Sequence, residues 1–211
     1  MPQTNRRISL GFSSEVVQEG LHMCYIFNDD EERNRTMAQF LSAGLQDREK
    51  VLYLVDVMSP SEFTDSMGQL GLDIPKYGDQ FSLYEALPTY CPDGLFSVDL
   101  MLDVVGTFYQ EARKDGYVGA RGSGEMSWAL RDGVVLKDEL MEYEARLTEI
   151  LEQYPMTACC QYDARIFDGA TIMNMLTVHP VVIVRGQLVK NPFFLSPDVF
   201  LKEYQARLAT S

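Results

Sequence analysis

Short apolar runs alternate with longer amphipathic segments along most of this chain. The run LHMCYIF at residues 21–27 is apolar apart from one histidine, which is typical of a strand buried on both faces of a sheet. Apolar side chains then recur at helical spacing from Glu31 onwards. The whole pattern predicts strands at residues 21–27, 50–56, 80–85, 117–120, 156–163 and 181–184, and helices from Glu31, from Ser59, and at 97–114, 137–153, 168–177 and 197–208.

This order of elements predicts the fold class. Strands separated by helices of ten or more residues indicate an α/β fold with three layers, in which helices cover both faces of a mostly parallel central sheet. In such sheets ligands bind beyond the carboxyl ends of the strands. Binding side chains are therefore expected in the loops that leave the strands, at residues 28–31, 56–59, 85–90, 121–128 and 161–165.

Size and composition fit one globular domain. The chain has 211 residues, 46% hydrophobic and 23% charged, so we expect a lead-in at residues 1–19 and a single domain at 20–208, with no output domain. We find no signal peptide, no long apolar span and no disulfide framework among the four cysteines, which predicts a cytoplasmic location. The net charge of −13 repels phosphates and anionic lipids and argues against direct nucleic-acid or membrane binding.

The loop after the first predicted strand lacks the features of a phosphate-binding loop. An ATPase would carry GxxxxGK[ST] there, because backbone N–H groups and a lysine hold the phosphates. This chain has FNDDEERNRT at residues 27–36, whose carboxylates repel phosphate at close range. A divergent nucleotide-binding protein or ATPase is therefore an alternative interpretation and not the favoured one.

His22 and Cys24 lie two residues apart on the first predicted strand, so their side chains point to the same face. A zinc site needs three or four ligands, and no CxxC or HxxxH spacing supplies them, although Cys160 on another predicted strand could approach Cys24 across the sheet. A Cys–His catalytic dyad is disfavoured because same-face neighbours on a strand sit roughly 6–7 Å apart. Core packing and a small binding pocket are the favoured interpretations, and a metal cluster of His22, Cys24 and Cys160 stays open as an alternative. The predicted site residues include no metal ligand, cofactor contact or catalytic group.

Three further features have both a structural and a functional interpretation. Glu125 and Trp128, in the segment RGSGEMSW, would place a charge and an aromatic wall at a strand exit, or else Glu125 caps a short helix and Trp128 fills the core. His179 is expected to contact the last carbonyls of a helix. The predicted helix at 137–153 is expected to have a solvated face, formed by Glu139, Glu142, Glu144, Glu149 and Arg146.

Several stretches, in order, resemble the MEDS domain, the sensory domain of methanogen, methylotroph and DcmR-type regulators. They are LHMCYIFNDDEERNRTMAQFLSAGLQDREKVLYLVD, then GEMSWAL, then YEARLTEILEQYPMTACCQYDARIFDGATIMNMLTVHPVVIVRGQLVKNPFF, within residues 20–204. The resemblance implies a RecA/KaiC-like fold without a working phosphate loop. It also implies a sensor of small hydrocarbon derivatives in prokaryotic signal transduction or transcription regulation. The family residues map to His22 and Cys24, to residues 124–128, and to Cys160 and Tyr162.

We therefore expect a non-enzymatic sensory domain that binds a small organic ligand at the carboxyl edge of the sheet. It would signal to a separate regulatory protein, a kinase or a DNA-binding regulator, and could form homo-oligomers. A protein-only adaptor is a second alternative beside the nucleotide-binding protein. The residues expected to contact the ligand are His22, Cys24, Tyr25, Arg121, Glu125, Trp128, Cys160 and Tyr162.

Overall fold

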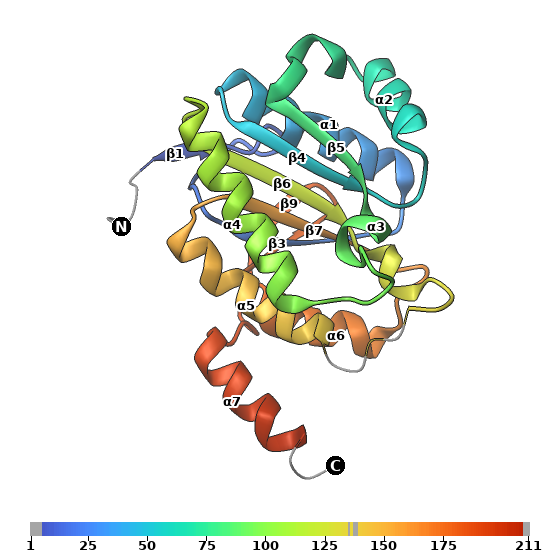
Figure 1. Ribbon diagram of the computed structural model, residues 1–211, viewed down its shortest axis with the longest axis vertical. Helices are drawn as coiled ribbons and strands as arrows, with labels where there is room; N and C mark the ends of the chain where they lie inside the picture. The colour runs from blue at the N-terminus through green and yellow to red at the C-terminus, as the bar shows by residue number, and fades with distance from the viewer. Residues whose placement is uncertain (1–5, 135, 137–138, 209–211) are drawn as a thin grey trace.

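The computed structural model describes residues 6–134, 136 and 139–208 (Figure 1). Its main sheet has seven strands in the order β5-β4-β6-β7-β3-β8-β9, parallel except for the antiparallel pair β8 and β9. β3 is the earliest of these strands in the sequence, yet it lies between β7 and β8. The strands are β3 (His22–Phe27), β4 (Lys50–Val55), β5 (Phe81–Glu85), β6 (Ala120–Glu125), β7 (Thr157–Asp163), β8 (Val181–Val184) and β9 (Gln187–Lys190).

Helices cover both faces of this sheet, which confirms the expected three-layer α/β architecture (Figure 1). One face packs against α1 (Asp30–Gln46) and α2 (Pro60–Gln69), and the other against α4 (Val98–Lys114) and α5 (Glu139–Gln153). The remaining helices are η1 (Ile74–Gln80), α3 (Ala86–Tyr90), η2 (Met126–Leu130), α6 (Gly169–Val178) and α7 (Pro197–Leu208). Among the described residues, no helix has both the length and the apolar character needed to cross a membrane. The cytoplasmic location stays a prediction.

Most predicted elements match the structure closely, and β6 is the main difference. The predicted strand at 181–184 and helix at 197–208 coincide with β8 and α7. The helix expected at 137–153 is α5, and its first two predicted residues lie outside the described part. β6 was expected at 117–120 and instead covers Ala120–Glu125, a segment of polar residues and glycines that have low strand propensity. It forms a strand because every one of its residues is buried between β4 and β7.

The lead-in also contributes to the packed domain. β1 (Arg7–Ser9) and β2 (Val16–Gln18) form an antiparallel pair that was not predicted. Ile8 and Leu10 are buried in the core layer that contains the apolar face of α1. The part of the lead-in before residue 6 lies outside the described residues. The N-terminal lead-in therefore packs against the α1 layer.

Candidate functional site

Strand alternation distributes the predicted ligand contacts over two faces of the sheet. The face covered by α4 and α5 holds His22, Cys24, Trp128, Cys160 and Tyr162. The face covered by α1 holds Tyr25, Arg121 and Glu125. The structure brings together residues of each face but does not gather them all in one pocket.

A buried group of four side chains with metal-ligating atoms lies between the sheet and α5. It consists of His22 from β3, Glu144 from α5, Cys160 from β7 and His179, the residue after α6, and we call it the His-Glu-Cys-His cluster. One ligand atom from each residue lies within 4.8 Å of the others. None of the four residues is more than 4% exposed.

Glu144 is central to this cluster. Its Oε2 atom lies 3.2 Å from His22 Nε2 and 3.3 Å from His179 Nε2. Its other oxygen, Oε1, accepts a hydrogen bond from the Tyr162 hydroxyl. Cys160 Sγ lies 3.5 Å from His22 Nε2. Each of the four side chains thus has an atom facing the same small volume.

The expectation that Glu144 lies on a solvated helix face was wrong. Glu144 is fully buried, because α5 places it beside Tyr143 and one turn before Leu147 on the stripe that faces the sheet. Glu142 and Arg146 do form a half-exposed ion pair on the same helix. Counting charges along the segment could not separate the one inward carboxylate from its solvated neighbours.

Hydrogen bonds on the outer side of the cluster fix both imidazole rings. His179 Nδ1 lies 2.8 Å from the Met175 carbonyl oxygen, which confirms the expected contact with the end of a helix. A carbonyl oxygen only accepts, so this Nδ1 carries the hydrogen. His22 Nδ1 lies 2.8 Å from the Thr148 hydroxyl oxygen, and that hydroxyl donates to the Val178 carbonyl. Both Nε2 atoms therefore face the cluster.

Burial and the neighbouring polar side chains together set the protonation of the cluster. Burial and the neighbouring His179 lower the pKa of His22 to about 4. Burial, with the Glu144 carboxylate nearby, raises the pKa of the Cys160 thiol well above its usual range. Burial alone would raise the pKa of Glu144, but the adjacent His179 and His22 outweigh it and lower that pKa.

The sequence signals for this cluster were incomplete. The register of β3 and β7 pairs Cys24 with Cys160, which confirms the expected approach across the sheet and places His22 near Cys160. Glu144 and His179 were missed as site residues. His179 comes close because it precedes β8, the other neighbour of β3. The available sequence signal was a histidine directly before a predicted strand, but only the structure shows that this strand pairs with β3.

A small apolar cavity lies on the same face, next to the cluster. Its volume is about 30 Å³, whereas one water molecule needs roughly 10–15 Å³. Gly122 and Gly124 line the cavity on the sheet side, where the ends of the Met156 and Tyr90 side chains pack closely against them. Cys160 lines the cavity as well as the cluster. The other lining residues include Leu52, Tyr90, Tyr143 and Met156.

Trp128 and Glu125 both have structural roles. Trp128 is fully buried and stacks on Tyr90 with ring centroids 4.4 Å apart, so it fills the core as one of the two interpretations proposed. Glu125 precedes η2 but makes no side-chain hydrogen bond that caps it. It faces α1 instead, where Arg33 Nη1 lies 3.0 Å from Oε1.

Arg121 is held near the opposite end of β6. It forms a buried ion pair with Glu49, and its guanidinium donates to the Phe40 carbonyl oxygen at 2.6 Å. The guanidinium also lies over the Phe40 ring, 4.8 Å from the centroid. Arg121 thus ties α1 to the sheet and does not reach the carboxyl edge.

The β3–α1 connection leaves no space for a phosphate loop. β3 ends at Phe27 and α1 begins at Asp30, so only two residues connect them. The Asp29 side chain accepts a hydrogen bond from the Glu32 backbone N–H at 2.7 Å. The positive end of the α1 dipole is therefore occupied by carboxylates of the chain itself.

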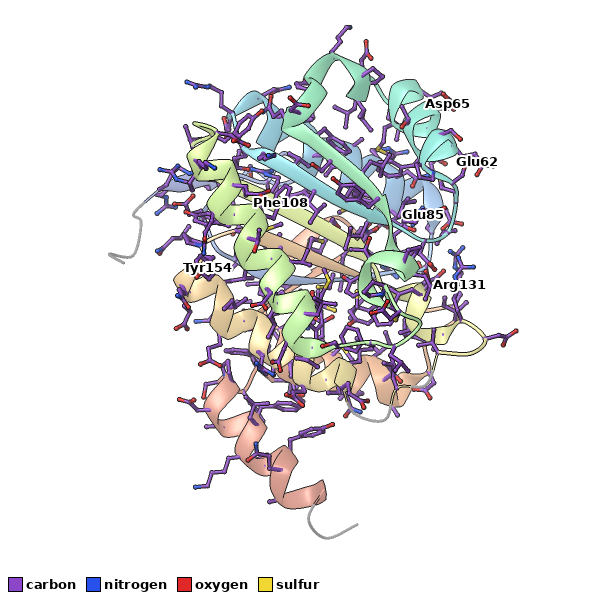
Figure 2. All side chains as sticks on the ribbon, in the orientation of Figure 1. Glu62, Asp65, Glu85, Phe108, Arg131 and Tyr154 are labelled. Carbon is purple, nitrogen blue, oxygen red and sulfur yellow. The ribbon has the colours of Figure 1, made fainter. Side chains whose placement is uncertain are left out.

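An open groove lies at the carboxyl edge of the sheet. Its walls include Asp56, Leu130, Arg131 and Ile166. Arg131, labelled in Figure 2, pairs with Asp56 at 3.0 Å between Nε and Oδ1. The predicted ligand contacts are absent from the groove lining.

Comparisons with known proteins extend these observations. A family model described as the methanogen/methylotroph, DcmR sensory domain, MEDS, matches residues 21–180. The transcriptional repressor DcmR of Methylorubrum extorquens is 32% identical over 80 residues, which are 37% of this chain and 30% of the repressor. The match therefore spans less than a third of that relative.

Two solved structures share the fold. A KaiC-like protein from Pyrococcus horikoshii OT3 is 18% identical with a TM-score of 0.62, covering 86% of this chain and 81% of that one. The flagellar accessory protein FlaH from Methanocaldococcus jannaschii is 15% identical with a TM-score of 0.61, covering 88% and 84%. At these identities the likeness concerns the fold alone, and it confirms the expected RecA/KaiC-like architecture.

Proposed function

Because the chain belongs to the MEDS family of sensory domains, we propose that it is a non-enzymatic sensor that binds a small organic molecule and passes its state to a regulatory protein. The partner would be a kinase or a DNA-binding regulator. Binding would shift an equilibrium between two conformations by the difference in affinity for them. The single observation that carries the ligand class is the buried apolar cavity.

The size of the cavity limits the ligand. About 30 Å³ is two to three times the roughly 10–15 Å³ that one water needs, so the ligand has few non-hydrogen atoms. The lining is mostly aliphatic and aromatic, with Cys160 as a polarizable contact. One-carbon and two-carbon alcohols, methylated amines, thiols and halocarbons have this size. Of the residues predicted from sequence, only Cys160 lines this cavity, so the other seven enter the proposal as its surroundings.

The two-residue β3–α1 turn disfavours the nucleotide-binding alternative. A phosphate group placed at the start of α1 would meet Asp29, Asp30 and Glu31 where a phosphate loop offers backbone N–H groups and a lysine. ATP with Mg²⁺ is therefore expected to leave the melting temperature unchanged.

Filling the cavity is expected to abolish the response to the ligand. A Cβ atom at position 122 would lie 2.3 Å from Met156 Cε, the end of a flexible side chain that must then move toward the cavity. The wild-type protein at a ligand concentration about 100 times Kd should melt roughly 5–10 °C higher, and Gly122→Ala should show no such shift. Differential scanning calorimetry with the four compound classes measures this.

Gly68→Ala is the matched control, because a Cβ atom there meets nothing within 4 Å. This variant should respond as the wild type does. A wild-type protein that responds to none of the compounds, or a Gly122→Ala protein that responds fully, would contradict the proposal.

A further inference from the structure

The geometry points to a metal site: we propose that the His-Glu-Cys-His cluster binds one divalent transition-metal ion, with Zn²⁺ as the best match. The ligand atoms would be Nε2 of His22 and His179, Oε2 of Glu144 and Sγ of Cys160. This inference goes beyond the proposed sensing of an organic ligand and does not depend on it.

The distances between these atoms already approach those of a zinc site. Bond lengths of about 2.0–2.1 Å to nitrogen or oxygen and about 2.3 Å to sulfur give tetrahedron edges of about 3.3 Å and, for sulfur, about 3.6 Å. The two separations between Glu144 Oε2 and the imidazole nitrogens are 3.2 and 3.3 Å. Cys160 Sγ to His22 Nε2 is 3.5 Å. All four ligand atoms lie within 4.8 Å of one another. Shifts of the side chains on the order of 1 Å would therefore bring the remaining pairs to the separations of a zinc site.

Two buried atoms that face the centre have no hydrogen-bond partner among the described residues. They are Glu144 Oε2 and His179 Nε2, which lie only 3.3 Å apart. Because His179 Nδ1 faces the Met175 carbonyl oxygen and so carries a hydrogen, Nε2 of the neutral ring presents a lone pair to the carboxylate. Two facing lone pairs repel unless a cation lies between them. A bound metal ion supplies that cation. The alternative is a second proton on the His179 ring, which would form a hydrogen bond to Glu144.

The surroundings resemble those of metal-binding side chains. Ligating histidines commonly donate their other N–H to a carbonyl, hydroxyl or carboxylate, which fixes the ring and its tautomer. His179 does so to Met175, and His22 contacts the Thr148 hydroxyl, whose own hydrogen is donated to Val178. The Tyr162 hydroxyl binds Glu144 Oε1 and leaves Oε2 facing inward.

The ligand set selects the class of metal. Two imidazoles, one thiolate and one carboxylate suit Zn²⁺, whereas Mg²⁺ and Ca²⁺ prefer oxygen ligands alone. Four buried protein ligands leave no open position, which is typical of a structural site. The ion would join β3, near the start of the domain, to α5, β7 and the end of α6, three consecutive elements much later in the chain.

The experiment uses the full chain without a polyhistidine tag, purified without chelators. We expect about one zinc ion per chain by mass spectrometry of the metal content. The Co²⁺-substituted protein is expected to show the thiolate-to-cobalt charge-transfer band and the intense visible bands of tetrahedral cobalt. Removal of the metal is expected to lower the melting temperature and re-addition to restore it. X-ray absorption spectroscopy at the zinc edge should show one sulfur ligand and three nitrogen or oxygen ligands.

Cys160→Ser is the test variant, and Cys24→Ala is its matched control. Cys24 is equally buried, pairs with Cys160 in the sheet register, and lies outside the cluster. Cys160→Ser should lose the cobalt charge-transfer band and bind zinc at least about 100-fold more weakly, since changes outside the ligand set alone cost 10–100-fold. Cys24→Ala should keep the band and the affinity.

Three outcomes would overturn the proposal. One is a folded wild-type protein that takes up no stoichiometric Zn²⁺ or Co²⁺. Another is a charge-transfer band that persists in Cys160→Ser. The third is ¹⁵N NMR showing the imidazole of His179 doubly protonated and unaffected by zinc, which would mean a proton bridges it to Glu144. If Cys160→Ser fails to fold, the wild-type cobalt and zinc spectra still decide. All these measurements are made without organic ligand, so they are independent of the calorimetric screen.

Discussion

Replacing Glu125 with alanine is expected to lower the free energy of unfolding by about 3–5 kcal/mol, because it leaves a buried charge without its partner. Arg33, whose side chain is 2% exposed, would keep its guanidinium in the core with Asn34 Oδ1 as a neutral acceptor. Glu125 also accepts hydrogen bonds from the Tyr53 hydroxyl and from the backbone N–H groups of Asp56 and Val57. Urea denaturation monitored by circular dichroism measures the loss.

Two further variants test whether the loss of stability in Glu125→Ala comes from the burial of the unpaired Arg33 charge. Glu31→Ala removes an exposed ion pair with Arg35 on the same helix and should cost no more than about 0.5 kcal/mol. The double variant Arg33→Met with Glu125→Gln removes both charges and keeps an acceptor, so it should lose less than Glu125→Ala. A loss below about 1 kcal/mol for Glu125→Ala would show that water reaches Arg33 and that the pair is not truly buried.

Gly44→Ala is expected to destabilise the protein by about 1–3 kcal/mol, although alanine is the better helix former by roughly 1 kcal/mol. A Cβ atom at this position in α1 would lie 2.2 Å from Arg121 Nε and 2.5 Å from its Cδ. Arg121 cannot move aside at low cost, because Glu49 and the Phe40 carbonyl hold its guanidinium. Overpacking therefore outweighs helix propensity. Chemical denaturation gives the sign directly.

Gly68→Ala in α2 provides the contrast. The added Cβ atom meets nothing within 4 Å, so only the higher helix propensity of alanine matters. The free energy of unfolding of this variant should rise by up to about 1 kcal/mol. If Gly44→Ala were also more stable than the wild type, Arg121 would have to be free to adopt another position, contrary to its contacts.

Much of the fold could be predicted from local patterns, because apolar runs and helical spacing depend on neighbours in the sequence. β3, β8 and α7 were found in this way. β6 was displaced in the prediction because Arg121, Ser123 and Glu125 are polar. Their partners, Glu49, the Cys159 carbonyl and Arg33, come from distant segments and were not visible in the sequence.

The site was predictable only in part, for the same reason. The likeness to MEDS domains pointed to His22 and Cys160, and strand pairing places them near each other. Glu144 was hidden among solvated acidic residues of α5, and His179 depended on where β8 docks. We expected all the predicted contacts to line a single pocket, which requires their side chains to lie on one face of the sheet. Strand alternation instead places them on two faces.

The place of β3 in the sheet has a consequence for biosynthesis. Its neighbours, β7 and β8, are among the last strands to leave the ribosome, and His22 and Cys160 are 138 residues apart. At a rate of synthesis of about 5–20 residues per second, roughly 7–28 s pass between the synthesis of β3 and that of β7, the strand with which it pairs. Its apolar side chains are exposed during that interval, so chaperone binding to the nascent chain and the loss of folding on C-terminal truncation before β8 are both expected.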